Sequence, residues 1–218
     1  DDPVVRLQSF GSLIHFRPEN APAGAPDRCT DGCPASAECP FDATRLYLNE
    51  ALTGWPVHVI TDDLSAGGRR AALRSGPYGR CVYRCDNDVV DQQVVAMELT
   101  SGTTLSLTVQ GHSHEEGRTM RYDGTRGTLR ARFGYRSEIE YHDHVGGRKS
   151  KLPIPAARTG HGGGDFGVLQ AFAAAVEGDP SSITSAREVL ESHLLALAAE
   201  RSRSSGKTIA MEDFRRGD

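Results

Sequence analysis

The sequence predicts an α+β fold, with an open, mixed and largely antiparallel sheet and helices packed on one face. Two observations lead to this prediction. Between residues 80 and 154, short segments in which polar and apolar residues alternate follow one another, separated by turn sequences. After residue 160 the apolar residues recur at helical spacing instead. A series of strands followed by helices is typical of a sheet that helices cover on one side.

The first expected element is a long strand over residues 4–16, in which Gly11 marks a bulge or a close approach of another segment. Residues 18–40 are rich in Pro, Gly and Cys and show little periodicity. A long irregular stretch inside a domain is usually functional or held in place by some interaction. Short elements should follow it: a helix at 43–50, a strand at 57–60 and a helical turn at 69–73.

A series of strands is then expected at residues 81–84, 94–99, 103–109, 118–122, 128–133, 137–142 and 149–154. The turn signals that separate most of them are Ser101-Gly102, Asp123-Gly124 and Gly146-Gly147. Residues 103–109 and 138–141 alternate polar and apolar side chains. This pattern predicts an antiparallel meander with one face in water.

Two helices should complete the domain. The first covers residues 166–176, with Asp165 as its N-cap, and ends at Gly178. The second begins at Ser185 with Glu188 three residues later, which is a capping box, and ends near Gly206. His193 lies on the apolar stripe of the second helix, where a hydrogen-bonded core histidine is expected. Residues 1–212 should form a single domain, followed by a polar tail at 213–218.

Composition excludes several function classes. The 218 residues include 25 basic and 29 acidic side chains, for a net charge of −4, so bulk positive charge cannot drive nucleic-acid binding. No apolar run approaches the ~20 residues that span a bilayer. With an odd number of cysteines, five, and no visible signal peptide, we expect a cytoplasmic protein without a disulfide framework.

The cysteines are a candidate metal site with an ordinary alternative. Cys29, Cys33 and Cys39 lie close together in sequence, and Cys81 or Cys85 could supply a fourth thiolate to a tetrahedral, structural zinc ion. Their spacing differs from the C-x-x-C of common zinc sites. Buried thiols without a metal are the alternative, because free cysteine is often buried.

The sequence GHGGGD at 160–165 is the second candidate site. Glycines ahead of a helix let backbone N–H groups approach an anion or a sugar hydroxyl, and His161 could act there as a general acid or base. The loop is not a GxGxxG dinucleotide fingerprint. The alternative is a mobile connector with a solvated histidine.

Two further groups of polar residues could bind a ligand. Asp86, Asn87, Asp88 and Asp91 could hold sugar hydroxyls or a cation, or could form ordinary turn hydrogen bonds. At the end of the first strand, His15 and Arg17 could face an anionic or hydroxylated ligand, or could form a strand-end ion pair.

Two His-x-His pairs, at 112/114 and 142/144, could bind a metal from one face of a strand. A sheet face in water with titrating surface groups is the alternative interpretation.

Four segments together resemble the C-terminal half of Gfo/Idh/MocA-type oxidoreductases, in particular a cysteine-containing bacterial branch. They are FGSLIHFRPENAPAGAPDRCTDGCPASAECPF at 10–41, CVYRCDNDVVDQQVV at 81–95, GHGGGDFGVLQAFAAAV at 160–176 and TSAREVLESHLLALAAERS at 184–202. The resemblance covers about residues 10–212.

The resemblance implies a substrate-binding and oligomerisation domain of an NAD(P)-dependent oxidoreductase that acts on a sugar, a cyclitol or a related polyol. Proteins of this family carry a Rossmann domain, a lysine in a Glu-Lys-Pro motif and a His-Asp pair, none of which lies in this sequence. NAD or NADP is therefore expected in the parent chain, with no cofactor binding and no turnover in this part alone. The bare face of the family's sheet packs against a partner subunit, which implies a homo-oligomer.

By position, the resemblance places the GHGGGD loop beside the nicotinamide and the substrate. His161 and Asp165 then become the best substrate-binding candidates, with Asp86–Asp88 near the same pocket. Two alternatives stay open: a free-standing, zinc-clamped oligomerisation module, and part of an NAD-dependent glycosidase.

Overall fold

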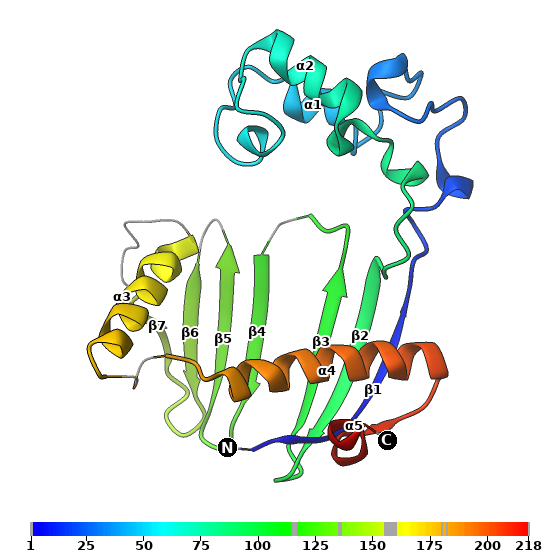
Figure 1. The fold of residues 1–218 in the computed structure, drawn as a ribbon. Coiled ribbons are helices and arrows are strands. Elements are labelled where there is room, and N and C mark those ends of the chain that lie inside the picture. Colours follow the sequence, from blue (N-terminus) through cyan, green and yellow to red (C-terminus); the bar gives the residue numbers. More distant parts are fainter. Residues whose placement is uncertain are drawn as a thin grey trace. The chain divides into compact units, whose positions relative to one another are not determined.

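The protein has an α+β fold, as the sequence predicts. The computed structural model describes residues 2–114, 117–134, 137–154, 161–179, 181 and 183–217. The chain divides into two compact units: unit 1, Asp1–Gly111 with Ala198–Asp218, and unit 2, His112–Leu197. Each unit holds one four-stranded sheet, so the strands expected in a single open sheet form two (Figure 1).

In unit 1 the first strand lies inside the sheet, between strands from distant parts of the sequence. The sheet has the order β3-β2-β1-β8 and all its pairs are antiparallel; its strands are β1 Val4–Ser12, β2 Gln92–Leu99, β3 Thr104–Gln110 and β8 Ile209–Ala210. A Cβ atom on Gly11 would lie 2.7 Å from the carbonyl oxygen of Gln92. Gly11 therefore marks the close approach that the sequence predicts.

Two helices pack against β1 and complete the core of unit 1. They are α4 (Ala186–Ser205), whose residues from 198 onward belong to this unit, and α5 (Met211–Arg216). Leu7 of β1 is 1% exposed, and Ala198 and Met211 are fully buried. The segment expected as a polar tail at 213–218 is described to residue 217 and supplies most of α5.

The buried hydroxyl of Ser202 joins three parts of unit 1. Its Oγ accepts a hydrogen bond from the backbone N–H of Ser9, 2.9 Å away on β1. The same hydroxyl donates to the carbonyl oxygen of Lys207, 2.7 Å away, just before β8. Gly206, with a φ of 69°, lies between Ser202 and Lys207 and ends α4, as the sequence predicts.

A long insertion connects β1 to β2. It contains α1 Ala43–Tyr47, α2 Ala66–Ser75 and short 3-10 helices at Pro18–Asn20, Cys29–Asp31, Val57–Val59, Pro77–Gly79 and Val82–Arg84. Leu73 is fully buried and Arg69 is 2% exposed. The Arg69 guanidinium donates to the carbonyl oxygens of Leu64 (2.7 Å) and Asn49 (2.9 Å), which compensates for its burial.

Two predictions of strands in the insertion, at residues 57–60 and 81–84, are wrong. Residues 57–59 and 82–84 form 3-10 helices, although both segments contain residues that favour strands. The described part of the insertion has one backbone β-bridge, between Arg28 and Arg80. An extended segment there has no sheet to join, so the burial of Val57 and Tyr83 decides the local structure.

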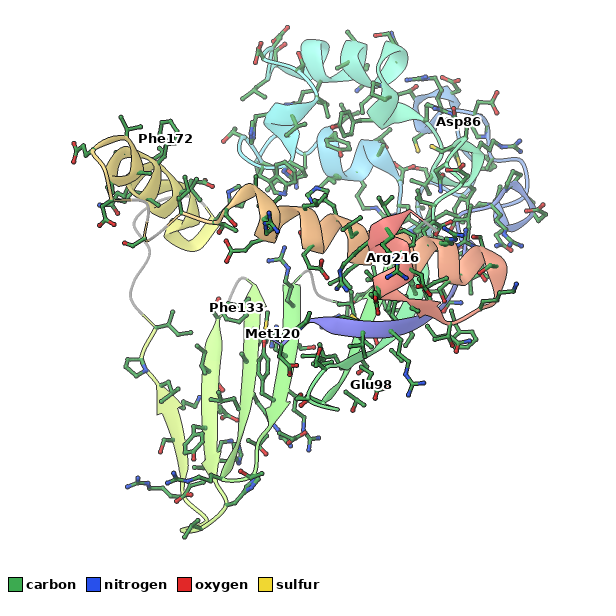
Figure 2. The ribbon with its side chains drawn as sticks, turned by 60° about the horizontal axis from the view of Figure 1, so that its bottom comes forward. Asp86, Glu98, Met120, Phe133, Phe172 and Arg216 are labelled. Atoms are coloured by element: carbon green, nitrogen blue, oxygen red, sulfur yellow. The ribbon has the colours of Figure 1, made fainter. Side chains whose placement is uncertain are left out.

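The sheet of unit 2 is the predicted meander, with the order β4-β5-β6-β7 and antiparallel pairs throughout. Its strands are β4 Gly117–Asp123, β5 Gly127–Gly134, β6 Glu138–Asp143 and β7 Lys149–Leu152. One face is charged. The other is apolar and includes Met120 and Phe133, both labelled in Figure 2. The alternation predicted for residues 138–141 is present in β6.

Helix α3 (Gly164–Val176) follows a 3-10 turn at His161–Gly163. The sequence predicts Asp165 as its N-cap, but Gly163 holds that position with a φ of 89°, and Asp165 lies in the first turn. A left-handed backbone favours glycine, so the helix begins earlier than expected. Phe172 of this helix is 58% exposed (Figure 2).

The capping box at the start of α4 is confirmed. The backbone N–H of Ser185 donates to Glu188 Oε2 (2.7 Å), and the backbone N–H of Glu188 donates to Ser185 Oγ (3.3 Å). His193 is not the expected core histidine, because it is exposed; its Nδ1 lies 2.8 Å from the carbonyl oxygen of Val189. Within the described residues, no helix is long and apolar enough to cross a membrane.

Replacing Ser202 with alanine should destabilise unit 1. The substitution leaves the buried N–H of Ser9 without its acceptor, at a cost of about 1–3 kcal/mol in the free energy of unfolding. Urea denaturation measures this loss. Ser204→Ala, on an exposed position of the same helix, is the control and should change the unfolding free energy little. Equal effects of the two substitutions would contradict the role given to Ser202.

Candidate functional site

His161 and Asp165 form an ion pair at the start of α3 in unit 2. His161 Nδ1 lies 2.9 Å from each carboxylate oxygen of Asp165. The side chains are 86% and 60% exposed, so the pair adds little stability. Within the described residues, the other ring nitrogen of His161, Nε2, has no hydrogen-bond partner. The pair therefore presents one oriented imidazole nitrogen.

The backbone around this pair is unusual for residues other than glycine. His161 has a φ of 49° and Gly163 a φ of 89°. Both values lie in the left-handed region, which tightens the turn before α3. The turn places an imidazole and a carboxylate four residues apart on one side of the helix start.

In unit 1, the acidic segment after the last 3-10 helix of the insertion serves several different purposes. Asp86 pairs with Arg80 at 2.8 Å, and the Arg80 guanidinium lowers the pKa of that carboxyl group. Asn87 and Asp88 are exposed. The charge of Asp88 acts on Arg203 of α4, whose pKa is raised mainly by its hydrogen bond to Glu200.

Asp91 belongs to the same segment but holds the backbone and is 4% exposed. Its Oδ2 accepts from the backbone N–H groups of Ile14 (3.1 Å), His15 (2.6 Å) and Phe16 (3.1 Å). Asp91 therefore binds backbone groups 75 to 77 positions away, which neither the turn hydrogen bonds nor the ligand contacts considered for this segment anticipated. The run of Asp and Asn residues drew attention to this segment in the sequence. It does not reveal that the partner of Asp91 is the backbone of residues 14–16, so far away along the chain.

His15 lies in an aromatic cluster at the beginning of the insertion. Its Nε2 is 3.2 Å from the hydroxyl oxygen of Tyr83, and its ring makes edge contacts with Phe16, Phe41 and Tyr83. Burial raises the pKa of Tyr83. The sequence analysis did not single out Tyr83. The only sequence signal near it is its position between Cys81 and Cys85. Arg17 is exposed and forms no salt bridge with any described residue.

The five cysteines are free thiols, and Cys81 is buried. Burial raises the pKa of Cys29, and Asp42, Cys81 and Cys39 add to the increase through their charges. Cys85 donates to the carbonyl oxygen of Cys81 at 3.4 Å. Over the described parts of the chain, no group of three or more His, Cys, Asp or Glu residues is arranged to hold a metal ion.

The two His-x-His pairs differ in structure. His112 and His114 precede β4 and do not lie on a strand, contrary to the expectation. On the charged face of unit 2, His142 Nε2 lies 3.5 Å from Glu140 Oε2 and is buried without a hydrogen-bond partner. Nearby, His144 Nε2 is 3.1 Å from Thr128 Oγ1. Of these four histidines, His142 lies on a strand, and His144 lies in the turn that follows β6.

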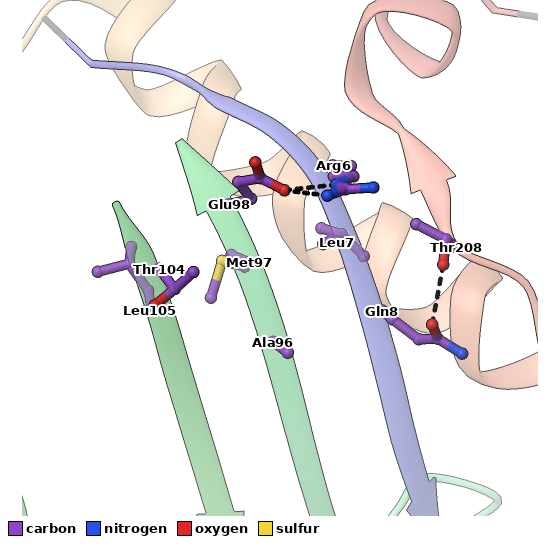
Figure 3. Close-up of a pocket in the computed structure, with 9 residues that line it drawn as sticks. All are labelled: Arg6, Leu7, Gln8, Ala96, Met97, Glu98, Thr104, Leu105 and Thr208. Carbon is purple, nitrogen blue, oxygen red and sulfur yellow. Dashed lines mark hydrogen bonds and ion pairs between the residues drawn. The ribbon is translucent and has the colours of Figure 1, made fainter. Parts of the chain in front are cut away.

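A cavity of about 310 Å³ was not anticipated from the sequence (Figure 3). It lies over the sheet of unit 1, where Arg6 and Glu98 pair at 2.5 Å and Thr208 Oγ1 donates to Gln8 at 2.8 Å. Its volume is at the small end for a ligand site. The side chains of Arg6 and Glu98 pair with each other, as do those of Gln8 and Thr208, so few polar groups are left to contact a ligand.

The candidate residues thus fall into two sets. Unit 1 contains His15, Arg17, Asp86, Asn87, Asp88 and the cysteines, and unit 2 contains His161 and Asp165. Within unit 1, Asp91 of the 85–91 segment accepts a hydrogen bond from the backbone N–H of His15. The hydroxyl of Tyr83, just before this segment, lies within hydrogen-bond distance of the His15 ring.

No protein-family model matches the sequence, and no curated protein matches it.

Solved oxidoreductases share the fold. The chain matches a protein described as a putative NADPH-dependent oxidoreductase from Desulfitobacterium hafniense over 97% of its own length, with a TM-score of 0.54 and 11% identity. It matches a protein described as a putative oxidoreductase from Thermotoga maritima over 95% of its own length, with a TM-score of 0.51 and 11% identity. It also matches the aldose-aldose oxidoreductase of Caulobacter crescentus, complexed with glycerol, over 96% of its own length, with a TM-score of 0.50 and 11% identity.

The chain spans 41–43% of the length of these three proteins. At this level of identity the similarity establishes a shared fold. It confirms, at the level of fold, the resemblance seen in the sequence.

Replacing Asp91 with asparagine should loosen the start of the insertion. The amide offers one acceptor oxygen and turns an N–H₂ group toward backbone donors, which should cost about 1–3 kcal/mol of unfolding free energy. Urea denaturation measures the cost, and hydrogen exchange at residues 14–16 should accelerate. Asp88→Asn, at an exposed position of the same segment, is the matched control. The assignment fails if both variants unfold at the same urea concentration.

Proposed function

We propose that this chain is the substrate-binding and oligomerisation domain of an NAD(P)-dependent oxidoreductase that acts on a sugar, a cyclitol or a related polyol. The observation that carries the proposal is the fold, which nearly the whole chain shares with oxidoreductases more than twice its length. The glycerol bound to the Caulobacter protein is a polyol, which supports the substrate class.

The chain's own residues fit a substrate better than a dinucleotide. The turn that opens α3 follows a 3-10 helix, whereas a phosphate-binding turn of the Rossmann type follows a strand directly. We therefore place NAD(P) on a separate nucleotide-binding domain of the parent enzyme. When bound there, the cofactor supplies the hydride chemistry.

Within this arrangement His161 would act as the general acid or base toward a substrate hydroxyl. Asp165 holds Nδ1 at 2.9 Å, so Nε2 can accept the proton of a substrate hydroxyl. The Asp165 carboxylate stabilises the imidazolium that forms. Asp86, Asn87, Asp88, His15 and Arg17 stay as secondary candidates for contacts with hydroxyl groups. A cytoplasmic location is consistent with five unpaired thiols.

Substituting His161 tests this function in the complete enzyme. His161→Ala should lower kcat/KM about 10²–10⁴-fold, the usual contribution of a general acid or base, and should remove one limb of the pH–rate profile. Asp165→Asn should give a smaller loss. The assay follows reduced nicotinamide with a panel of sugars, cyclitols and polyols and with each of NAD⁺ and NADP⁺.

His193→Ala is the control, because this exposed histidine lies in the same unit and its ring nitrogen Nδ1 lies at hydrogen-bond distance from a carbonyl oxygen of its own helix. It should retain the activity of the unmodified enzyme. Absence of turnover with every member of the panel would count against the substrate class. Full activity in His161→Ala would remove this residue from the reaction.

The zinc-clamped alternative has a separate test. Because the described cysteines show no metal arrangement, we expect purified protein to contain no stoichiometric zinc. Cys33→Ser should then leave the unfolding midpoint unchanged. Elemental analysis that finds one zinc ion per chain, lost in Cys33→Ser, would favour a structural zinc site instead.

A further inference from the structure

The meander of unit 2 carries an excess of positive charge in an otherwise acidic protein. Residues 117–152, which contain its four strands, include nine basic and four acidic side chains, for a net charge of +5 with histidine neutral. The whole chain has a net charge of −4. Charge of one sign that gathers on one element attracts ligands of the opposite sign. The meander should therefore attract anions more strongly than the rest of the chain.

Two arginines lie directly opposite each other on this sheet. Arg121 of β4 is the register partner of Arg130 of β5. Side chains in such positions share one face, with Cβ atoms about 4.5–5.5 Å apart, and like charges there are destabilising. Both side chains are exposed, that of Arg121 by 61%. The pair thus presents two guanidinium groups to solvent on the charged face, at a cost to the stability of the sheet.

The neighbouring carboxylates do not neutralise both arginines. Asp123 pairs with Arg121, whose Nε lies 2.7 Å from Asp123 Oδ2. Glu140 of β6 is the register partner of Arg130 on its other side, but Glu140 Oε1 lies 2.7 Å from Lys149 Nζ. Among the residues that the structure describes, the Arg130 guanidinium has no ion-pair or hydrogen-bond partner. One positive charge of the arginine pair is therefore left uncompensated.

A phosphoryl group matches this pair in charge and in geometry. The ion pair with Asp123 uses Nε of Arg121 and, among the described residues, leaves the N–H groups of its two terminal nitrogens without a partner. Arginine binds phosphate oxygens through two parallel N–H···O bonds. A phosphate dianion between the two guanidinium groups would accept from both and remove their repulsion. A carboxylate has a single charge and two oxygens, so it can serve one arginine.

We propose that Arg121 and Arg130 form a binding site for a phosphate-bearing ligand on the charged face of β4 and β5. The ligand bridges the two guanidinium groups and stabilises the pairing of these strands. The site recognises the phosphoryl group, which a soluble phosphate ester or a phospholipid headgroup can supply. It shares no residue with the His161–Asp165 pair. The inference therefore goes beyond the proposed function and does not depend on it.

Calorimetric titration with inorganic phosphate tests the site in the purified protein. At constant ionic strength, the unmodified protein should bind one phosphate per chain. Arg121→Gln and Arg130→Gln should each weaken binding about tenfold or more, because each removes charge-assisted hydrogen bonds. Arg118→Gln is the matched control, because Arg118 is exposed and lies on the same strand as Arg121 but on the opposite face. It should leave the affinity for phosphate unchanged.

A second measurement separates a specific site from general attraction to a basic sheet. In chloride without phosphate, Arg130→Gln should raise the urea midpoint of unfolding, because it removes the contact between like charges. Phosphate at the same ionic strength should raise the midpoint of the unmodified protein, because a ligand that binds the folded state stabilises it. It should leave the midpoint of Arg130→Gln unchanged. One substitution thus stabilises the free protein and removes its response to phosphate.

Vesicles distinguish the two sources of the phosphoryl group. Phosphatidylcholine vesicles that contain phosphatidic acid should bind the protein through Arg121 and Arg130 if the ligand is a headgroup. Binding of inorganic phosphate without binding to these vesicles assigns a soluble ester instead. Circular dichroism checks that each variant is folded.

Three results would overturn the proposal. The protein binds neither phosphate nor the vesicles, or Arg118→Gln weakens binding as much as Arg130→Gln does. The third is that phosphate raises the unfolding midpoints of Arg130→Gln and the unmodified protein equally.

Discussion

The buried carboxylate of Asp91 is the contact on which the arrangement of unit 1 depends most. It accepts hydrogen bonds from three consecutive backbone N–H groups at residues 14–16, while its own N–H donates to the carbonyl oxygen of Ser12. The two ends of the insertion are therefore joined where β1 ends and β2 begins. Without this junction, a long irregular segment would be tied to its sheet by few backbone hydrogen bonds.

That junction also determines where His15 lies. The ring of His15 follows directly from the backbone that Asp91 holds, and Tyr83 meets it from the other end of the insertion. Residues far apart in the sequence thus form one aromatic cluster. The cysteines of the insertion lie partly in the same surroundings, since Cys39 and Cys81 add to the raised pKa of Tyr83. A small cluster of this kind gives an irregular segment a core of its own.

Unit 2 follows a different principle, because nearly all its contacts are between neighbouring strands. A meander with short turns separates its polar and apolar side chains by simple alternation. The charged face that results contains ion pairs and one orphaned histidine nitrogen, His142 Nε2. The same unit carries His161 and Asp165, the candidate proton-transfer pair.

Local sequence determined much of this protein. The turn-separated strands expected from 118–122 to 149–154, with alternation at 138–141, predicted the meander of unit 2. Ser185 and Glu188 predicted the start of α4, and Gly206 predicted its end. These features depend on neighbours in the chain, whose chemistry is readable directly. Of the candidate site, the resemblance singled out His161 and Asp165, and the structure added the contact between them.

Tertiary structure decided the rest. Residues 57–59 and 82–84 became 3-10 helices because no sheet was available to them, and Gly163 rather than Asp165 capped α3 because the turn required a left-handed backbone. Asp91 became an anchor because segment 14–16 reached it across 75 positions of sequence. Such outcomes depend on which distant segments meet, and residue periodicity carries information only about which faces are apolar.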